Sequence, residues 1–157
     1  MVRKKFVYII LLLMLVLTGC SYYGGKNIKT SNNSNSVEGS IILQFESNHF
    51  KFYSKEQDKG CLKDLSNALE NNYERITNDL NTSLNKKIYV YIYSDLSTYH
   101  EAINRPDAPN WVVGSAEPPN VIYMVNPSKE SELSYSDFMK VIVHEFTHIV
   151  AYNITQA

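Results

Sequence analysis

The sequence has only two cysteines in 157 residues, Cys20 and Cys61, which excludes a fold held together by a disulfide framework. It also lacks an excess of positive charge, since 15 lysines and arginines stand against 16 aspartates and glutamates. Without a basic patch of the kind that binds phosphates, nothing indicates a nucleic-acid partner. No internal repeat is visible, and no apolar run reaches the roughly 20 residues that a membrane-spanning helix needs.

The amino-terminal segment has the pattern of a secretion signal. A basic stretch at residues 3–5 precedes an unbroken apolar run at residues 6–17, which is too short to span a bilayer. The run ends in Leu-Thr-Gly-Cys, which resembles the lipobox of bacterial lipoproteins. The resemblance implies that residues 1–19 are a signal peptide and that Cys20 carries the lipid. The protein would then be extracytoplasmic and anchored to the bacterial cell membrane through Cys20; an uncleaved anchor or an ordinary signal peptide is the alternative.

Removal of the signal peptide would take away three cations and no anions, which changes the formal net charge from −1 to −4. With Cys20 lipidated, Cys61 has no disulfide partner, and we expect it to pack as a small apolar side chain at the start of a helix. Residues 20–40 are rich in Gly, Ser, Asn, Thr and Lys, so they bury too little apolar surface to fold. We expect a flexible tether there and a folded domain in residues 41–157.

The most informative stretch is His144-Glu145-Phe146-Thr147-His148. On an α-helix, residues four apart lie on the same face, so the imidazoles of His144 and His148 can converge on one metal ion. Glu145 lies about 100° around the helix from His144, which leaves its carboxylate beside the metal, where a general base for a metal-bound water is needed. The pattern predicts a Zn²⁺ site with two histidine ligands and a catalytic glutamate. The alternative is a chance match on a core helix, with both histidines bonded to nearby carbonyls.

Apolar residues flank this motif on both sides, at residues 141–143 and 149–151, so we expect its helix to be buried nearly all round. Ser134 or Ser136 can cap the start of the helix, and Asp137 favours its first turn.

Two other histidines are not expected to bind metal. His100 begins a similar pattern, but Asn104 stands at the position of the second ligand. We expect His100 to be a surface or half-buried helix residue, and His49 to lie alone in a strand.

The remaining patterns predict strands and helices in alternation. In order, these are strands at residues 41–45 and 49–53, a helix at 59–80, a strand at 87–93, a short helix capped by Ser94, and strands at 111–116 and 121–125. The strand at 87–93 is expected to be central, with both faces covered. Its alternate tyrosines suit sheet packing, with a carbohydrate platform as the alternative. The order predicts an α+β domain with a mixed β-sheet.

This order, with the motif helix last, resembles the amino-terminal half of a gluzincin zinc metallopeptidase, and more narrowly the peptidase MA-like family of exported bacterial proteins. The resemblance covers residues 40–157 and is carried mainly by residues 141–150. It implies a zincin-like amino-terminal subdomain with an active-site helix, and a peptide or protein substrate. In gluzincins the strand before this helix is a sheet edge that pairs with the substrate, so Gly114, Ser115 and Ala116 would bind a peptide backbone. A β-bulge at Gly114 is the alternative.

A catalytic zinc site has three protein ligands. Gluzincins supply the third as a glutamate on a later helix, but residues 149–157 contain no Asp, Glu, His or Cys. The metzincin pattern fails too, because Ala151 and Ile154 stand at its glycine and histidine positions. The third ligand is therefore expected to be absent from this chain. The explanations are a fragment of a longer enzyme, which we favour, a degenerate form, or a ligand from another subunit.

Two functions follow as hypotheses. The first is an extracytoplasmic, membrane-anchored zinc metallopeptidase that hydrolyses peptide bonds with a zinc-activated water and Glu145 as general base. This chain alone would be inactive for lack of a third ligand. The second is a non-catalytic surface lipoprotein that binds a peptide, a glycan or a protein partner.

Overall fold

The computed structural model describes residues 39–128 and 133–155. The predicted signal peptide, the predicted lipidation site Cys20 and nearly all of the predicted tether lie outside these residues. No helix among the described residues is long and apolar enough to cross a membrane.

The described residues form a five-stranded mixed sheet in the order β1-β2-β3-β5-β4. The strands are β1 (Ile42–Glu46), β2 (Phe50–Ser54), β3 (Ile88–Tyr93), β4 (Gly114–Glu117) and β5 (Val121–Val125). β2, β3 and β5 run parallel, whereas β1 pairs antiparallel with β2 and β4 pairs antiparallel with β5. The prediction of an α+β domain with a mixed sheet is confirmed, and β3 is its central strand. The predicted hairpin strand at residues 111–116 starts too early, because residues 111–113 precede β4.

A 3₁₀-helix, η1 (Glu56–Cys61), leads into the long helix α2 (Leu62–Asp79), and the other helices are α3 (Leu96–Ala102) and α4 (Tyr135–Ile154). Cys61 is buried at the start of α2 as predicted, and burial raises the pKa of its thiol to about 12. Ser134 caps α4, since its hydroxyl accepts a hydrogen bond from the Asp137 N–H at 3.2 Å.

The prediction that Ser94 caps α3 is wrong. The cap is Asp95, whose side chain accepts a hydrogen bond from the Thr98 N–H at 2.9 Å. The Ser94 hydroxyl donates instead to the buried carboxylate of Asp58, at 2.5 Å. A buried carboxylate without hydrogen-bond donors costs free energy, whereas water can bond to the free backbone N–H groups at an exposed helix end.

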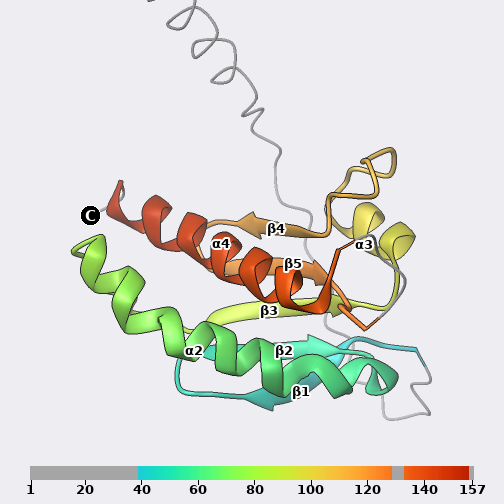
Figure 1. Ribbon diagram of the computed structural model, residues 1–157, viewed down its shortest axis with the longest axis horizontal. Helices are drawn as coiled ribbons and strands as arrows, with labels where there is room; N and C mark the ends of the chain where they lie inside the picture. Colours follow the sequence, from blue (N-terminus) through green and yellow to red (C-terminus); the bar gives the residue numbers. More distant parts are fainter. Residues whose placement is uncertain (1–38, 129–132, 156–157) are drawn as a thin grey trace, which may run out of the picture. The chain divides into compact units, whose positions relative to one another are not determined.

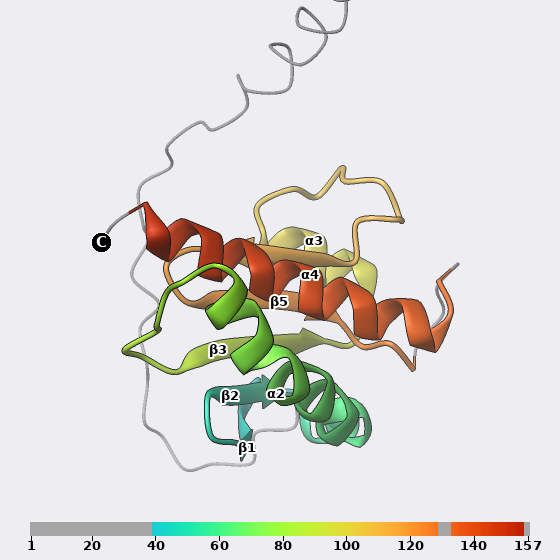
Figure 2. The same ribbon diagram turned by 60° about the vertical axis from the view of Figure 1, so that its left-hand side comes forward.

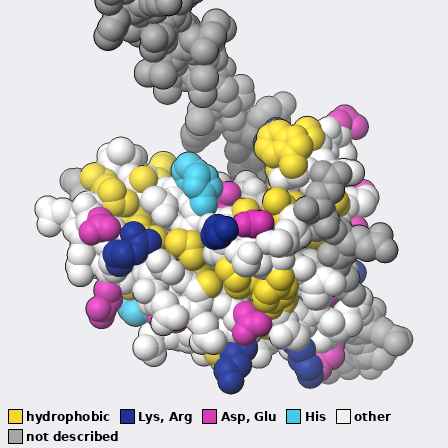
Figure 3. Space-filling model, in the orientation of Figure 1, with side chains coloured by type: hydrophobic (Ala, Val, Ile, Leu, Met, Phe, Trp, Pro, Cys, Tyr) yellow, Lys and Arg dark blue, Asp and Glu magenta, His cyan; other side chains and the backbone are white. Residues whose placement is uncertain are grey.

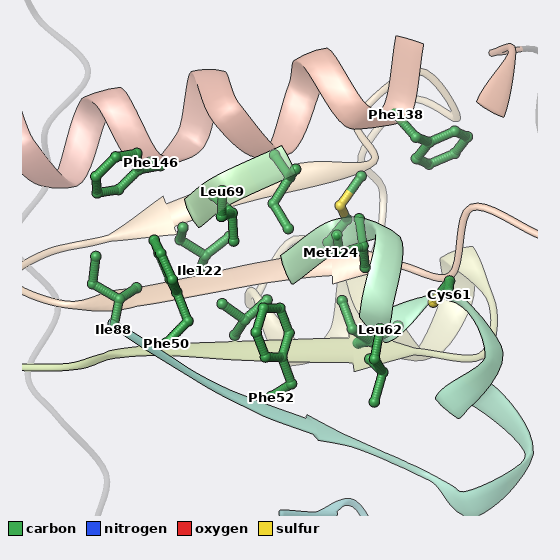
Figure 4. Packing of buried hydrophobic residues seen from close by; sticks show 14 of the residues in the cluster. Phe50, Phe52, Cys61, Leu62, Leu69, Ile88, Ile122, Met124, Phe138 and Phe146 are labelled. Carbon is green, nitrogen blue, oxygen red and sulfur yellow. The ribbon is translucent and has the colours of Figure 1, made fainter. Parts of the chain in front are cut away.

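Helices α2 and α4 lie side by side on one face of the sheet (Figures 1 and 2). The core between the sheet and the two helices is built from alternate strand residues and from one face of each helix (Figure 4). Its fully buried side chains include Phe50, Phe52, Ile88, Ile122, Met124, Leu65, Leu69, Phe138, Ile142 and Phe146. Burial of these apolar side chains is the main source of stability, and it sets which face of α4 points inward.

The opposite face of the sheet carries tyrosines. Tyr89, Tyr91 and Tyr93 alternate with the core residues of β3 and are half-buried, as the expectation of sheet packing for these tyrosines requires. Tyr91 stacks on Tyr53 of β2, with ring centroids 4.8 Å apart, and it also contacts Tyr123 of β5 at 5.6 Å. The rings pack against one another across the strands, and Tyr99 of α3 packs against Tyr93, with centroids 6.3 Å apart, so this face is partly dry.

Candidate metal centre

One face of α4 is exposed, although the sequence predicted a helix buried nearly all round. Phe138, Ile142, Phe146, Ile149 and Val150 point into the core, whereas both motif histidines are exposed. Figure 3 shows histidine side chains at the surface over α4. The apolar composition was misleading because α4 lies beside the edge strand β4, where the sheet and α2 cover only part of the helix.

The imidazoles of His144 and His148 converge at this exposed face. Their Nε2 atoms lie 2.9 Å apart, and the ring planes are nearly perpendicular, at 89°. A tetrahedral zinc ion with Zn–N bonds of about 2.0–2.1 Å separates two such nitrogens by about 3.3 Å, so the pair would open by only about 0.4 Å to hold the metal. Neither ring lies in the core, where the alternative of structural histidines would have placed them.

Glu145 is half-buried beside the histidines, against the edge strand β4. Burial raises the pKa of its carboxyl above the ordinary value, while His148, His144 and the backbone N–H of Ala116 act in the opposite direction. The Glu145 side chain therefore lies against β4 in partly dry surroundings. A group in this position can accept and return a proton more readily than an exposed glutamate.

Gly114 allows Val141 and Glu145 of α4 to pack closely against β4. A Cβ atom at Gly114 would lie 2.8 Å from Cγ1 of Val141 and 3.3 Å from Cγ of Glu145. The pairing of β4 with β5 is regular at this point, with Gly114 opposite Met124. The glycine thus marks close approach of a helix to a strand, and no bulge is present there.

The outer edge of β4 pairs with no other strand among the described residues. The Val125 N–H donates to the Val113 carbonyl at 3.0 Å, so in an antiparallel pair Ser115 also directs its backbone groups toward β5. Gly114 and Ala116 direct theirs outward, and the Ala116 N–H accordingly meets Glu145. Of the three residues predicted to bind a peptide backbone, only these two present N–H and C=O groups at the free edge.

His100 is buried, and the prediction of a surface or half-buried position is wrong. It is 4% exposed, and its Nε2 atom lies 2.9 Å from the carbonyl oxygen of Val112. The imidazole thereby satisfies a buried carbonyl in the segment that leads into β4. Its neighbour Tyr99 is fully buried, and its hydroxyl is the one buried side-chain polar atom without a hydrogen-bond partner in the described part of the chain.

His49 lies in the turn before β2 and not in a strand. Its Nδ1 atom is 2.6 Å from a carboxylate oxygen of Glu70, and its ring stacks on Tyr73 with centroids 3.5 Å apart. These contacts attach the β1–β2 turn to α2. His49 therefore has a structural role among the described residues.

A cavity of about 310 Å³ opens next to the motif. Its lining includes Trp111, Val112, Val113, Val141, His144 and Glu145. No sequence pattern indicated this cavity or the buried role of His100. The cavity depends on α4 and the segment before β4, and the role of His100 depends on the contact of α3 with that segment.

Residues 39–128 and 133–155 contain no group of three or more His, Cys, Asp or Glu side chains placed to hold a metal ion. Within these residues the centre therefore has two histidine donors and one adjacent carboxylate. Comparison with protein-family models, with curated proteins and with solved structures finds no match for this chain.

Proposed function

We propose that the protein is an extracytoplasmic, membrane-anchored zinc metallopeptidase of the gluzincin type. The observation that carries the proposal is the convergence of His144 and His148, with Nε2 atoms 2.9 Å apart, beside a half-buried Glu145. Two imidazoles one helical turn apart with a carboxylate between them suit metal-assisted peptide hydrolysis.

In this proposal His144 and His148 hold the zinc ion through their Nε2 atoms. When bound, zinc polarises a carbonyl and lowers the pKa of water to about 7. Glu145 takes a proton from the attacking water and gives it to the leaving amine. Partial burial raises the pKa of the Glu145 carboxyl, while His148, His144 and the Ala116 N–H oppose this rise. A third protein ligand is required, and the described residues do not supply it.

The substrate in this proposal is an extended peptide that pairs with β4. Gly114 offers an outward N–H and C=O, and Ala116 offers an outward C=O, next to Glu145. Strand addition at this edge would bring a peptide backbone alongside the carboxylate. The membrane anchor belongs to the proposal through Cys20, which lies outside the described residues.

The first test is zinc binding by the chain, measured by isothermal titration calorimetry with His144→Ala, His148→Ala and Glu145→Gln variants. We expect weak binding of one zinc ion per chain, loss in both histidine variants, and little change in Glu145→Gln. His49→Asn is the matched control, because His49 lies outside the centre. Unchanged zinc affinity in His144→Ala would exclude the proposed metal site.

The presence of only two histidine donors among the described residues favours a second candidate, a non-catalytic lipoprotein that binds a peptide at the free edge of β4. Hydrolysis of a peptide library with saturating zinc separates the two. Cleavage that is abolished in Glu145→Gln supports the peptidase. Peptide binding without cleavage supports the binding protein, provided that a third protein ligand to the zinc ion is present in the sample.

A further inference from the structure

A second cavity, of about 520 Å³, lies where α2 and α4 end. Three segments enclose it, namely the loop from α2 to β3, the turn from β4 to β5, and the last turn of α4, which lie at the same end of the sheet (Figure 1). Its lining shares no residue with the cavity beside the motif. Its volume is within the roughly 300–1,000 Å³ that small-molecule pockets span, so a compact organic ligand fits.

Two asparagines of this lining have amide oxygens that are left as acceptors. The Asn153 Nδ2 atom donates to the carbonyls of Pro119, at 2.9 Å, and Ile149, at 2.8 Å. The Asn120 Nδ2 atom donates to the Lys87 carbonyl at 3.1 Å. The opposite orientation of either amide would place its oxygen against a carbonyl oxygen, so these contacts fix which atom is free. Neither Oδ1 atom accepts a hydrogen bond from another described residue.

The loop from α2 to β3 forms another wall, and its backbone is held in place. The Thr82 N–H donates to the Thr77 carbonyl at 2.9 Å, and the Leu84 N–H meets the Tyr73 hydroxyl. The polar side chains of this wall make no hydrogen bond with other described residues, and they are Asn81, Thr82, Ser83 and Asn85. The loop therefore presents amide and hydroxyl groups to the cavity on a fixed backbone, which lowers the entropic cost of binding a ligand.

The charge of the lining excludes most charged ligands. Among the described residues, no aspartate or glutamate contributes to it, so nothing there would compensate a metal ion or an ammonium group. Lys86 is its single charge in this part of the chain, and an exposed lysine attracts an anion only weakly once salt screens it. The partial negative charge at the ends of α2 and α4 also disfavours anions and favours hydrogen-bond donors. The lining thus suits an uncharged ligand that carries donors.

A smaller part of the lining is apolar and is formed by Leu84, Ile88 and Pro119. Ile88 is fully buried, and Leu84 packs against the core. A purely apolar ligand would cover these residues but would leave the asparagine oxygens without donors, which costs free energy. A sugar ring has hydroxyl groups around its edge and C–H groups on its faces. It can therefore donate to the asparagines and cover the apolar residues at the same time.

We propose that this cavity binds a neutral saccharide, whose hydroxyl groups donate to Oδ1 of Asn120 and Asn153 and bond to the loop at residues 81–86. Asn153 and His148 are on the same helix, so the saccharide would bind near the end of the helix that carries the metal centre. Neither zinc nor Glu145 takes part in this binding. The site goes beyond the proposed function and gives the chain a second ligand, of a different chemical class from the peptide.

The experiment is a titration of the isotope-labelled whole chain, followed by two-dimensional NMR, which resolves the side-chain amide groups of asparagines. The probes are glucose, N-acetylglucosamine, glucosamine as a cationic analogue, and capped trialanine as a peptide. We expect at least one neutral sugar to shift the amide signals of Asn120 and Asn153 saturably, and to bind about fivefold or more tighter than glucosamine or the peptide. No saturable shift with either neutral sugar, or tighter binding of glucosamine or of the peptide, would overturn the proposal.

A matched set of variants tests the assignment of the wall. Asn85→Ala removes an exposed amide from the lining, and Asn71→Ala removes one from the exposed face of α2, outside it. Asn85→Ala should weaken binding of the neutral sugar about fivefold, the effect of about one lost hydrogen bond, and Asn71→Ala should not. Thr82→Val, which removes a hydroxyl at similar volume, should act like Asn85→Ala. Neither side chain has an internal partner among the described residues, so the fold should be kept. Equal binding by all three variants would contradict the proposal.

The same titration without zinc separates this site from the metal centre. Sugar binding by a chain that binds no zinc would leave the saccharide site standing and remove the peptidase proposal. Zinc binding that depends on His144, together with unshifted Asn120 and Asn153 signals in the presence of both neutral sugars, would remove the saccharide site and leave the peptidase proposal standing.

Discussion

The ring of Phe146 lies stacked on the ring of Tyr73, with centroids 5.6 Å apart and planes within 15° of parallel. Phe146 lies between His144 and His148 in the motif, and Tyr73 is on α2, so this contact fixes the rotation of α4 about its axis. A second contact, edge-on with Phe50 of β2 at 5.5 Å, fixes it further. The buried side of the motif thus determines where its two histidines point.

Replacement of Phe146 by Ala should destabilise the fold by about 3–5 kcal/mol, the usual effect of removing a buried phenyl ring. Phe146 is fully buried, so the resulting cavity cannot fill with water at low cost. Denaturant unfolding followed by circular dichroism measures the change. Phe45→Ala is the control, because Phe45 is 40% exposed and its replacement should lower the free energy of unfolding much less. Equal effects of the two variants would mean that the stack does not anchor α4.

Replacement of Gly114 by Ala should push α4 away from β4. The new methyl group would lie 2.8 Å from Val141, and overpacking of this kind costs about 1–3 kcal/mol. We expect a lower melting temperature together with weaker zinc binding, because Glu145 and His144 move with the helix. Gly60→Ala is a matched control, since nothing lies within 4 Å of a Cβ atom there. If Gly114→Ala is as stable as Gly60→Ala, the helix is not held as closely as described.

Replacement of Tyr99 by Phe should leave the protein equally stable or make it more stable by about 1 kcal/mol, because it removes a buried hydroxyl that has no partner among the described residues. Burial raises the pKa of this hydroxyl, and the nearby Glu145 carboxylate adds to the effect, so ionisation offers no relief. Tyr135→Phe is the contrasting variant, since its hydroxyl donates to Asp64 at 2.7 Å. A loss of more than about 1 kcal/mol in Tyr99→Phe would show that the hydroxyl has a partner in solution.

Glu70 should make stability depend on pH in the acid range. Burial raises the pKa of its carboxyl, but hydrogen bonds from Ser47 and His49 and the attraction of His49 outweigh burial and hold the pKa below the ordinary 4.5. A carboxyl with a lowered pKa in the folded state binds fewer protons there than in the unfolded state. Its stabilising contribution is therefore complete above about pH 4.5 and is lost as the pH falls through the lowered value.

The measurement for Glu70 is the difference in unfolding free energy between the protein and Glu70→Gln, taken from pH 3 to pH 7. The difference should shrink toward acid pH. Glu74→Gln, at an exposed position on the same helix, should show a smaller and flatter difference. A difference for Glu70→Gln that does not change with pH would mean that its bonds to His49 do not depend on its charge.

Periodicity and spacing were sufficient for most of the helices and strands and for the convergence of His144 and His148. The tyrosine alternation in β3, a serine cap at Ser134 or Ser136 and the i, i+4 spacing of the histidines are local properties, so the sequence alone was enough to predict them. The predictions that were wrong depend on contacts with residues distant in the sequence. His100 is buried because it meets Val112, and Ser94 is drawn away from α3 by Asp58, 36 residues earlier.

The exposure of α4 could not be predicted for a similar reason. Its apolar residues are dense enough for a helix inside a core, but how much of it is covered depends on its neighbours, which are the edge strand β4 and α2. Likewise, Trp111 to Val113 are apolar enough for a strand, yet β5 ends opposite Val113 and pairing stops there.

The contact between Glu145 and the Ala116 N–H has a consequence for self-association. An unpaired strand edge is a template on which a second copy of a protein can extend the sheet. In β4, which has only four residues, a charged side chain already meets one of the outward N–H groups. A strand from another molecule would have to displace that carboxylate from its donor. Glu145 thus opposes complete pairing of β4 with a second copy, while it leaves the Gly114 N–H and C=O and the Ala116 C=O open to a peptide.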